Sequence, residues 1–319
     1  GITKIVLPQL PVIPLGIHTK DFAYSTEQRV KAREKISTGD DTLVVLYTGR
    51  LSFHAKAHPL AMYQALENAA QVTGKEVILI ECGWHSNEYI EKAFADGAKL
   101  ASPSVKVITL DGRVAKNRET AWASADVFCS LSDNIQETFG IVPIEAMAAG
   151  LPVVVSDWDG YKDTVRDGVD GFRIPTIAPA PSLAGDLAYR HALEIDTYDM
   201  YCGLSSSLVA VHAQKLTQAF IELFQSPELR KKMGDAGRLR ATQDYDWRTI
   251  IPRYEELWDE QTKIRLAAKK ALEEGAKKSG KPLAPLVWPA RLDPTIGFAN
   301  YPTQHLTLAT ELTLTEPSA

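Results

Sequence analysis

Short apolar runs alternate with amphipathic helical patterns from residue 42 onward. The runs that we expect to form strands cover residues 42–47, 76–81, 105–109, 127–130 and 153–156, with a short one around Phe172. The clearest helical pattern covers residues 60–73, where five apolar side chains share one helical face: Leu60, Met62, Ala65, Leu66 and Ala69. Strands that alternate with helices are typical of a parallel sheet covered on both faces. The predicted fold is therefore α/β, a doubly wound parallel sheet.

The alternation of strands and helices ends near residue 175. Before that point, further helices are expected at residues 86–94, 118–123, 143–149 and 161–165, and after it Pro, Ala and Ser cluster. We interpret residues 175–212 as an insertion with room for one short helix. Helical periodicity resumes near Ala213, Ser226-Pro227 is typical of a helix start, and a long helix is expected over residues 250–278. A Pro- and Thr-rich extended tail follows from residue 282.

Composition and charge exclude several classes of protein. Of the 319 residues 45% are hydrophobic, and the net charge of −5 comes from interspersed acidic and basic residues. We therefore expect a soluble globular protein with no nucleic-acid partner. Cys82, Cys129 and Cys202 are odd in number and scattered, which argues against a disulfide framework or a zinc cluster. Because no segment approaches the roughly 20 apolar residues that span a bilayer and no signal-peptide pattern is present, a cytoplasmic location is expected.

A glycine and two cationic residues follow the first predicted strand. Gly49-Arg50 comes directly after it, and Lys56 lies at the approach to the next helix. Ligands of open α/β sheets bind beyond the carboxyl ends of the strands, where glycine permits close backbone approach and the arginine fork matches phosphate oxygens. Taken alone, this pattern is more often that of solvated surface side chains. The phosphate interpretation therefore depends on a second element.

That second element is the segment from Glu137 to Glu145. Gly140 follows a strand and a polar loop, and Pro143 suits the first position of a helix. A helix start carries unpaired N–H groups and partial positive charge, so the backbone from Gly140 onward can bind phosphate oxygens. Glu137 in the loop and Glu145 in the expected first turn can accept hydrogen bonds from sugar and ribose hydroxyls. Turn capping and a helix-dipole effect are the alternative, which the cations after the first strand disfavour.

These residues resemble the motifs of retaining glycosyltransferase family 4 (group 1). The Glu137 to Glu145 segment is similar to the two-glutamate motif of that family, Gly49-Arg50-Leu51 with Lys56 to its donor-phosphate motif, and residues 13–17 to its interdomain linker. The resemblance implies the C-terminal, Rossmann-like donor-binding domain of a two-domain (GT-B) enzyme. Residues 1–20 would then be a linker remnant, residues 21–258 the nucleotide-sugar-binding domain, and residues 259–319 a C-terminal helix and extended tail.

The resemblance also implies a role for each residue in binding a nucleoside-diphosphate sugar. Arg50 and Lys56, beside Gly49, would hold the diphosphate and stabilise the leaving nucleotide. Glu137 would touch hydroxyls of the transferred sugar, and Glu145 would hold the ribose. The backbone N–H donors would come from Phe139, Gly140, Ile141 and Val142, and Arg113 would approach the base. The implied catalytic residues are Arg50, Lys56 and Glu137, with no metal and no cofactor besides the donor substrate.

Two departures from the family pattern bear on this interpretation. The spacing from Arg50 to Lys56 is longer than in the motif, which puts Lys56 in doubt, and no first Rossmann-like domain precedes the linker. We therefore expect a hexosyltransferase donor domain that is inactive without its acceptor-binding N-terminal domain. Two alternatives remain open: a non-catalytic nucleotide-sugar-binding module, and another enzyme on the same architecture, such as a nucleotide-sugar epimerase or a phosphorylase.

Other candidate residues have simpler explanations. A surface or helix-start role is favoured for His85, and turn formation explains Asp133 and Asn134. Residues 158–161 are interpreted as a turn with partly buried aromatic rings. Weak peripheral membrane contact through Lys269, Lys270, Lys277 and Lys278 is less favoured than a solvated helix face, because acidic residues interrupt the cations. The aromatic residues of the tail could pack on the absent domain or on the sheet: Trp288, Phe298 and Tyr301.

Overall fold

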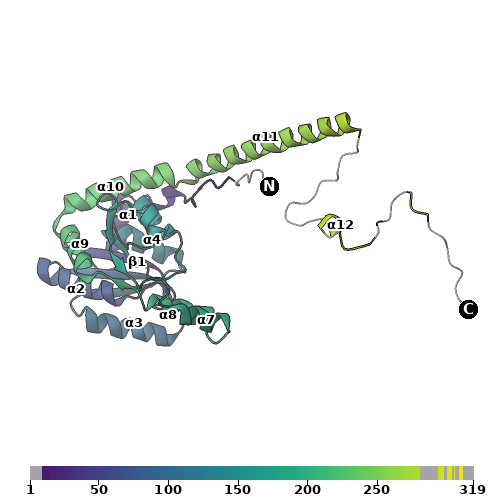
Figure 1. Cartoon of the computed structure of the whole chain (residues 1–319). Coiled ribbons are helices and arrows are strands. Elements are labelled where there is room, and N and C mark those ends of the chain that lie inside the picture. Colours follow the sequence, from purple (N-terminus) through teal and green to yellow (C-terminus); the bar gives the residue numbers. More distant parts are fainter. Residues whose placement is uncertain (1–8, 281–293, 298–299, 304, 306–308, 312–319) are drawn as a thin grey trace, which may run out of the picture. The chain divides into compact units, whose positions relative to one another are not determined.

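The fold was obtained as a computed structural model (Figure 1). The structure describes residues 9–280, 294–297, 300–303, 305 and 309–311. The chain divides into two compact units, residues 1–255 and residues 256–319, and each is described here by itself. The predicted contacts of Trp288 and Phe298 lie outside the described residues.

The first unit is built on a six-stranded sheet in which all paired strands run parallel. The strand order is β3-β2-β1-β4-β5-β6. The strands are β1 (Leu43–Leu51), β2 (Val77–His85), β3 (Lys106–Asp111), β4 (Val127–Ser130), β5 (Val153–Ser156) and β6 (Gly171–Ile174). The order reverses between β1 and β4, which creates a crevice at the carboxyl ends of these two strands. The predicted doubly wound parallel sheet is confirmed.

Helices cover both faces of the sheet (Figure 1). One face packs against α2 (Leu60–Thr73), α3 (Glu88–Ala101) and α9 (Ala213–Gln225). The other packs against α4 (Ala115–Ser124) and α5 (Ile141–Ala148), with α1 (Thr26–Lys35) lying on α4. Outside residues 175–212, the remaining elements of this unit are η1 (Thr19–Phe22), the short α6 (Tyr161–Thr164), α10 (Pro227–Asp244) and the start of α11 (Trp247–Ser279). Helix α2 has the bounds that its apolar periodicity predicts.

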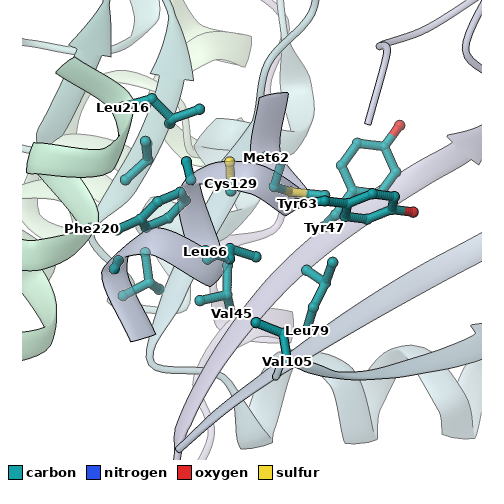
Figure 2. Packing of buried hydrophobic residues seen from close by; sticks show 14 of the residues in the cluster. Val45, Tyr47, Met62, Tyr63, Leu66, Leu79, Val105, Cys129, Leu216 and Phe220 are labelled. Atoms are coloured by element: carbon teal, nitrogen blue, oxygen red, sulfur yellow. The ribbon is translucent and has the colours of Figure 1, made fainter. Parts of the chain in front are cut away.

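The core between the sheet and α2 is aliphatic, with tyrosines at its border. Figure 2 shows Val45 and Leu79 of the sheet beside Leu66 of α2, while the hydroxyl groups of Tyr47 and Tyr63 point away from this cluster. All five side chains are buried. Burial of such side chains is the main force that holds the helix on the sheet, about 1.5–3 kcal/mol for each large apolar side chain.

Helix α1 is a feature that the apolar pattern does not predict. Its residues are mostly polar, but Ser25 and Gln28 form a capping box at its start. Its Arg33 is buried and donates to the carbonyl groups of Gly39, Thr42 and Ser124 and to the carboxylate of Asp126. Together with Arg29, which also pairs with Asp126, this side chain fixes α1 to the residues that precede β1 and β4.

The predicted insertion, residues 175–212, is folded and contains two helices, whereas the sequence predicted one. Its base is the antiparallel pair β7 (Thr176–Ile177) and β8 (Ala210–Val211). Between them lie α7 (Gly185–Ala192) and α8 (Tyr198–Ser206). An ion pair of Arg190 with Asp196, at 2.7 Å, holds the turn between the two helices. The sequence does not predict the second helix because α7 and α8 both carry exposed apolar residues. Apolar positions on the solvent side obscure the helical periodicity of the pattern.

One helix boundary and one strand boundary near the predicted site also differ from the sequence predictions. Helix α5 begins at Ile141 with Gly140 as its N-cap, so Pro143 is its third residue and Glu145 lies beyond the first turn. Strand β1 extends to Leu51, so Gly49 and Arg50 belong to the strand and do not follow it. The long strand forms because β1 and β2 pair in register to Leu51 and His85, beyond the apolar run that predicts its core.

The second unit contains the remainder of α11 and the short α12 (Pro294–Gly297). The side-chain nitrogen of Lys269 lies 4.0 Å from a carboxylate oxygen of Glu273 on a solvated face of α11. All four lysines that were considered for membrane contact are exposed: Lys269, Lys270, Lys277 and Lys278. Tyr301 is 82% exposed. Within the described residues, no helix has the length and apolarity needed to cross a bilayer.

Candidate functional site

The predicted site residues lie around the carboxyl ends of β1, β2 and β4. This edge carries a row of three glycines, Gly49, Gly83 and Gly112, on adjacent strands and the loop that follows β3. A β-carbon at Gly83 would overlap the Gly49 carbonyl oxygen, and Gly49 has a φ of +146°, a region that favours glycine. The Gly112 N–H donates to the Gly83 carbonyl oxygen at 2.9 Å. Bare backbone therefore lines this part of the edge.

Lys56 and Glu137 meet across the crevice. The Lys56 ammonium group forms an ion pair with Glu137, whose side chain is only 10% exposed. The Tyr161 hydroxyl group lies 3.4 Å from the same carboxylate and 2.8 Å from the Ser130 hydroxyl group at the end of β4. The structure thus brings together two predicted residues that are distant in sequence, and it adds Tyr161.

Tyr161 also explains why the helix that follows Glu137 begins with glycine. Gly140 has a φ of +80°, and a β-carbon there would overlap the Tyr161 ring. A β-carbon at Gly160 would lie 2.5 Å from the Phe139 α-carbon, so the two loops approach each other closely. No side chain caps the start of α5 among the described residues. Its first N–H groups, from Ile141 and Val142, remain available to an anion because intrahelical bonds begin later.

Arg50 and Arg113 occupy this edge without contacting the glutamates. The Arg50 guanidinium group is half-buried and donates to the Ala55 carbonyl oxygen at 3.4 Å, within the loop that leads to Lys56. Arg113 is exposed and forms a bidentate pair with Asp111 of its own loop. Hydrogen bonds from the Arg113 side chain and backbone lower the pKa of Asp111 to about 2.

Glu145 has surroundings of its own. Its side chain is half-buried, and burial raises its pKa to about 7, opposed by the charge of Arg118. Arg118 donates to the Gly112 carbonyl oxygen at 2.7 Å, which ties it to the glycine row. No hydrogen bond to the Glu145 carboxylate comes from any residue that the structure describes. The carboxylate is therefore open to an external donor.

Sequence reasoning undervalued the residues that connect these loops. Asn134 is buried and donates to the His54 carbonyl oxygen at 3.0 Å, and Trp158 donates to the Asn134 carbonyl oxygen at 3.1 Å. Asp133 accepts from the His58 N–H, and one of its oxygens is buried without a partner. Their position after β4 and β5, at the edge that carries the other candidates, was the signal. Turn formation alone does not explain them.

Burial raises the pKa of two carboxyl groups beneath the site. It raises the pKa of Asp133 to about 7 and that of Glu81 to about 7. Glu81 accepts a hydrogen bond from the Tyr63 hydroxyl group. His85, whose ring packs against Phe94 at 5.3 Å, has its pKa lowered by burial. His85 thus packs on α3.

A metal site was not expected, and the described residues contain no group of three or more His, Cys, Asp or Glu side chains that could hold a metal ion. The cysteines Cys82, Cys129 and Cys202 are free and buried.

Comparison with protein families and curated proteins points in one direction. Residues 28–185 match the model of the family described as glycosyl transferases group 1. A phosphatidyl-myo-inositol mannosyltransferase of Mycobacterium leprae is 31% identical over 156 residues, 47% of this chain and 32% of that protein. A D-inositol 3-phosphate glycosyltransferase of Geodermatophilus obscurus is 30% identical over 184 residues, 53% of this chain and 37% of that protein. The match therefore spans well under half the length of these relatives.

Solved structures support the fold. The Anabaena protein HepE, solved in complex with UDP-glucose, superposes with a TM-score of 0.56 at 19% identity, covering 78% of this chain and 57% of that one. Sucrose-phosphate synthase from Thermosynechococcus elongatus has a TM-score of 0.54 at 20% identity, covering 81% and 54%. At these identities the likeness concerns the fold. Over residues 28–185 the chain is therefore similar to the glycosyl transferases group 1, and its sheet order agrees with the fold of these solved structures.

Proposed function

We propose that the chain binds a nucleoside-diphosphate sugar at the carboxyl edge of its sheet, as the donor-binding domain of a retaining hexosyltransferase of family 4. The observation that supports this most directly is the Lys56–Glu137 ion pair, held by Tyr161 beside the glycine-led start of α5. This arrangement places a cation, free N–H groups and a hydroxyl-accepting carboxylate at one place. The relatives that match are themselves sugar transferases.

The diphosphate would lie between β1 and the start of α5. Arg50 and Lys56 supply positive charge from one side, and the N–H groups of Gly140, Ile141 and Val142 supply donors from the other. Bond breakage between sugar and diphosphate leaves charge on the departing phosphate, which these groups stabilise. In this proposal a divalent metal is not required, since the two cations and the helix start neutralise that charge.

The sugar and the ribose would lie on opposite sides of this diphosphate. In this proposal the bound ligand replaces the ion pair between Lys56 and Glu137. Glu137 then accepts hydrogen bonds from hydroxyl groups of the sugar, and Lys56 contacts the diphosphate. Glu145 accepts from the ribose, with Arg118 and Gly112 beside it and Arg113 at the outer rim. Arg118 was not among the residues expected from the sequence.

The complete reaction requires an acceptor site, which we place on a further domain. The matches of this chain cover about a third of its curated relatives, and HepE is nearly twice as long as the part that superposes. We propose that this chain alone binds donor but does not transfer sugar. Joined to an acceptor domain, it would retain the anomeric configuration of the sugar.

Calorimetric titration of UDP-glucose and GDP-mannose into the chain tests the binding site. Arg50→Met should weaken binding of the nucleotide sugar by about 1.5–3 kcal/mol, the range for hydrogen bonds to charged groups. Lys92→Met, which removes an exposed cation paired with Asp96 on α3, serves as the matched control and should leave binding unchanged. Equal affinity of wild type and Arg50→Met would remove Arg50 from the site.

A second measurement separates transfer from the other functions that remain open. The chain fused to the acceptor domain of a full-length relative is incubated with the donor that binds, and the products are separated by chromatography. Transfer to acceptor supports the proposal. Binding without any sugar product would identify a non-catalytic module, and conversion to an isomeric nucleotide sugar would identify an epimerase.

A further inference from the structure

The insertion touches both loops that carry the proposed sugar-binding residues. On α8, a β-carbon added at Gly203 would lie 3.0 Å from the β-carbon of His54, in the loop of Lys56. The neighbouring Cys202 accepts a hydrogen bond from the side-chain amide of Gln136 at 3.1 Å, and Gln136 directly precedes Glu137. Two adjacent residues of one helix therefore meet the two sides of the Lys56–Glu137 pair.

The insertion is held together at its base and between its two helices. Its base is closed by β7 and β8, and the His212 N–H donates to the Pro175 carbonyl oxygen at 2.9 Å. Within it, the rings of His191 and Tyr201 stack at 5.2 Å between α7 and α8. Cys202 is fully buried, whereas α7 has no buried residue. Helix α8 is therefore the part of the insertion that is anchored, and it is anchored at the donor site.

Close packing against His54 explains why a glycine stands at position 203. The backbone of α8 approaches the His54 loop so closely that Gly203 leaves almost no space for a side chain. Elsewhere in the insertion, a β-carbon added at Gly185 would have nothing within 4 Å, so close approach is specific to Gly203. Asn134 already joins the two loops from within, and α8 adds a second constraint from outside.

We infer that the insertion, residues 175–212, is part of the donor site and that Cys202 and Gly203 are positioning residues. They hold the Lys56 and Glu137 loops at the separation that the diphosphate and the sugar require. This inference rests on the proposed function. It adds α8 to the residues that border the site, and α8 lies beyond residue 185, where the family match ends. Among the described residues, no hydrogen bond or ion pair joins the insertion to Glu145 or Arg118 on the ribose side.

Gly203→Val tests this inference by forcing α8 away from His54. Calorimetry should show a rise of about 10-fold to 100-fold in the Kd of the nucleotide sugar that wild type binds, as expected when a hydrogen bond to a charged group is lost. The Kd of the matching nucleoside monophosphate should stay unchanged, since it uses the ribose side. Amide hydrogen exchange in residues 52–57 and 134–138 should become faster.

Three further variants make the result decisive. Gly185→Val introduces the same side chain at an open position of α7 and should bind like wild type. His54→Gly combined with Gly203→Ala should restore much of the affinity that Gly203→Ala loses, because it removes the β-carbon that the new methyl group meets. Gln136→Leu removes the bond to Cys202 without changing α8, and it decides the question if Gly203→Val fails to fold.

The outcomes distinguish the inference from the proposed function. If wild type binds the nucleotide sugar and neither Gly203→Val nor Gln136→Leu changes the Kd, the insertion has no role in the donor site. Equal losses for nucleotide sugar and nucleoside monophosphate would also overturn the inference, since they would indicate general destabilisation. Absence of binding by wild type to any UDP- or GDP-sugar would overturn the proposed function and this inference together.

Discussion

Individual side chains at this edge of the sheet have chemical states that depend on burial. Glu137 keeps a cation beside it and shares its carboxylate with Tyr161, whereas Glu145 is half-buried beside Arg118 and has its pKa raised to about 7. The same residue type therefore has two environments a few residues apart in the chain. This difference suits two tasks, one at the sugar and one at the ribose.

The raised pKa of Glu145 predicts how nucleotide-sugar binding depends on pH. A ribose hydroxyl donates a stronger hydrogen bond to the carboxylate than to the neutral acid, so the affinity should fall as the pH drops through about 7, by up to about tenfold per unit. A nucleotide sugar is the suitable ligand, because its diphosphate does not titrate in this range. Calorimetry from about pH 6 to about pH 8 measures the effect. Glu145→Gln should bind more weakly and without this dependence; a similar pH profile in both proteins would exclude Glu145 from ribose binding.

At the scale of elements, much of the molecule follows from local pattern. Apolar periodicity predicts α2 at its actual bounds, and the strand segments 127–130 and 153–156 coincide with β4 and β5. The apolar pattern does not predict helix α1 because two arginines, Arg29 and the buried Arg33, attach it through hydrogen bonds and ion pairs. Its capping box was the signal available in the sequence.

Arg33 should therefore be among the most sensitive positions for stability. Arg33→Met removes one of the two arginines that pair with Asp126 and leaves the carbonyl groups of Gly39, Thr42 and Ser124 without this donor, at a cost of about 1–3 kcal/mol for each buried acceptor left unsatisfied. Urea denaturation measures the free energy of unfolding. Arg113→Met, which breaks an exposed ion pair with Asp111, should cost less than about 1 kcal/mol. Comparable losses in the two variants would show that Arg33 has no special structural role.

The start of α5 offers a second prediction at this scale. Gly140→Ala places a methyl group in the Tyr161 ring at a backbone conformation that costs about 1–3 kcal/mol for other residues. We expect lower stability and weaker nucleotide-sugar binding, measured by denaturation and calorimetry. Gly168→Ala is the control, because Gly168 has a similar φ of +72° but nothing within 4 Å. The extra loss at Gly140 reports the contact with Tyr161, and no extra loss would mean that the ring moves aside freely.

At the scale of the whole molecule, burial beneath the site affects stability. Glu81 and Asp133 each have their pKa raised to about 7 by burial. A carboxyl group with a raised pKa binds its proton more tightly in the folded state, so it contributes stability at low pH that is lost as the pH rises to about 7. Asp170 and Asp246 have lowered pKa values, chiefly through hydrogen bonds from Arg166 and Arg248 that outweigh burial, and they stabilise in the opposite direction.

The free energy of unfolding should therefore depend less on pH once Glu81 is neutral. Glu81→Gln keeps an acceptor for Tyr63 and removes the titrating group. Relative to wild type, its stability should improve by about 1–3 kcal/mol between about pH 5 and about pH 7. Urea denaturation across this range measures the difference. Parallel stability curves for the two proteins would indicate that Glu81 titrates normally.

The sequence by itself determined the alternation of strands and helices, the doubly wound sheet and the edge where Gly49, Lys56 and Glu137 gather, because these depend on periodicities and turn residues within short segments. Only the tertiary structure decided the pairing of Lys56 with Glu137, the contact of Gly140 with Tyr161 and the packing of α8 on the loops that carry Lys56 and Glu137. Each of these joins residues that are far apart in the chain. Burial, which raises the pKa of Glu145, likewise arises from neighbours that no local pattern names, and so the chemistry of the site depends on long-range packing.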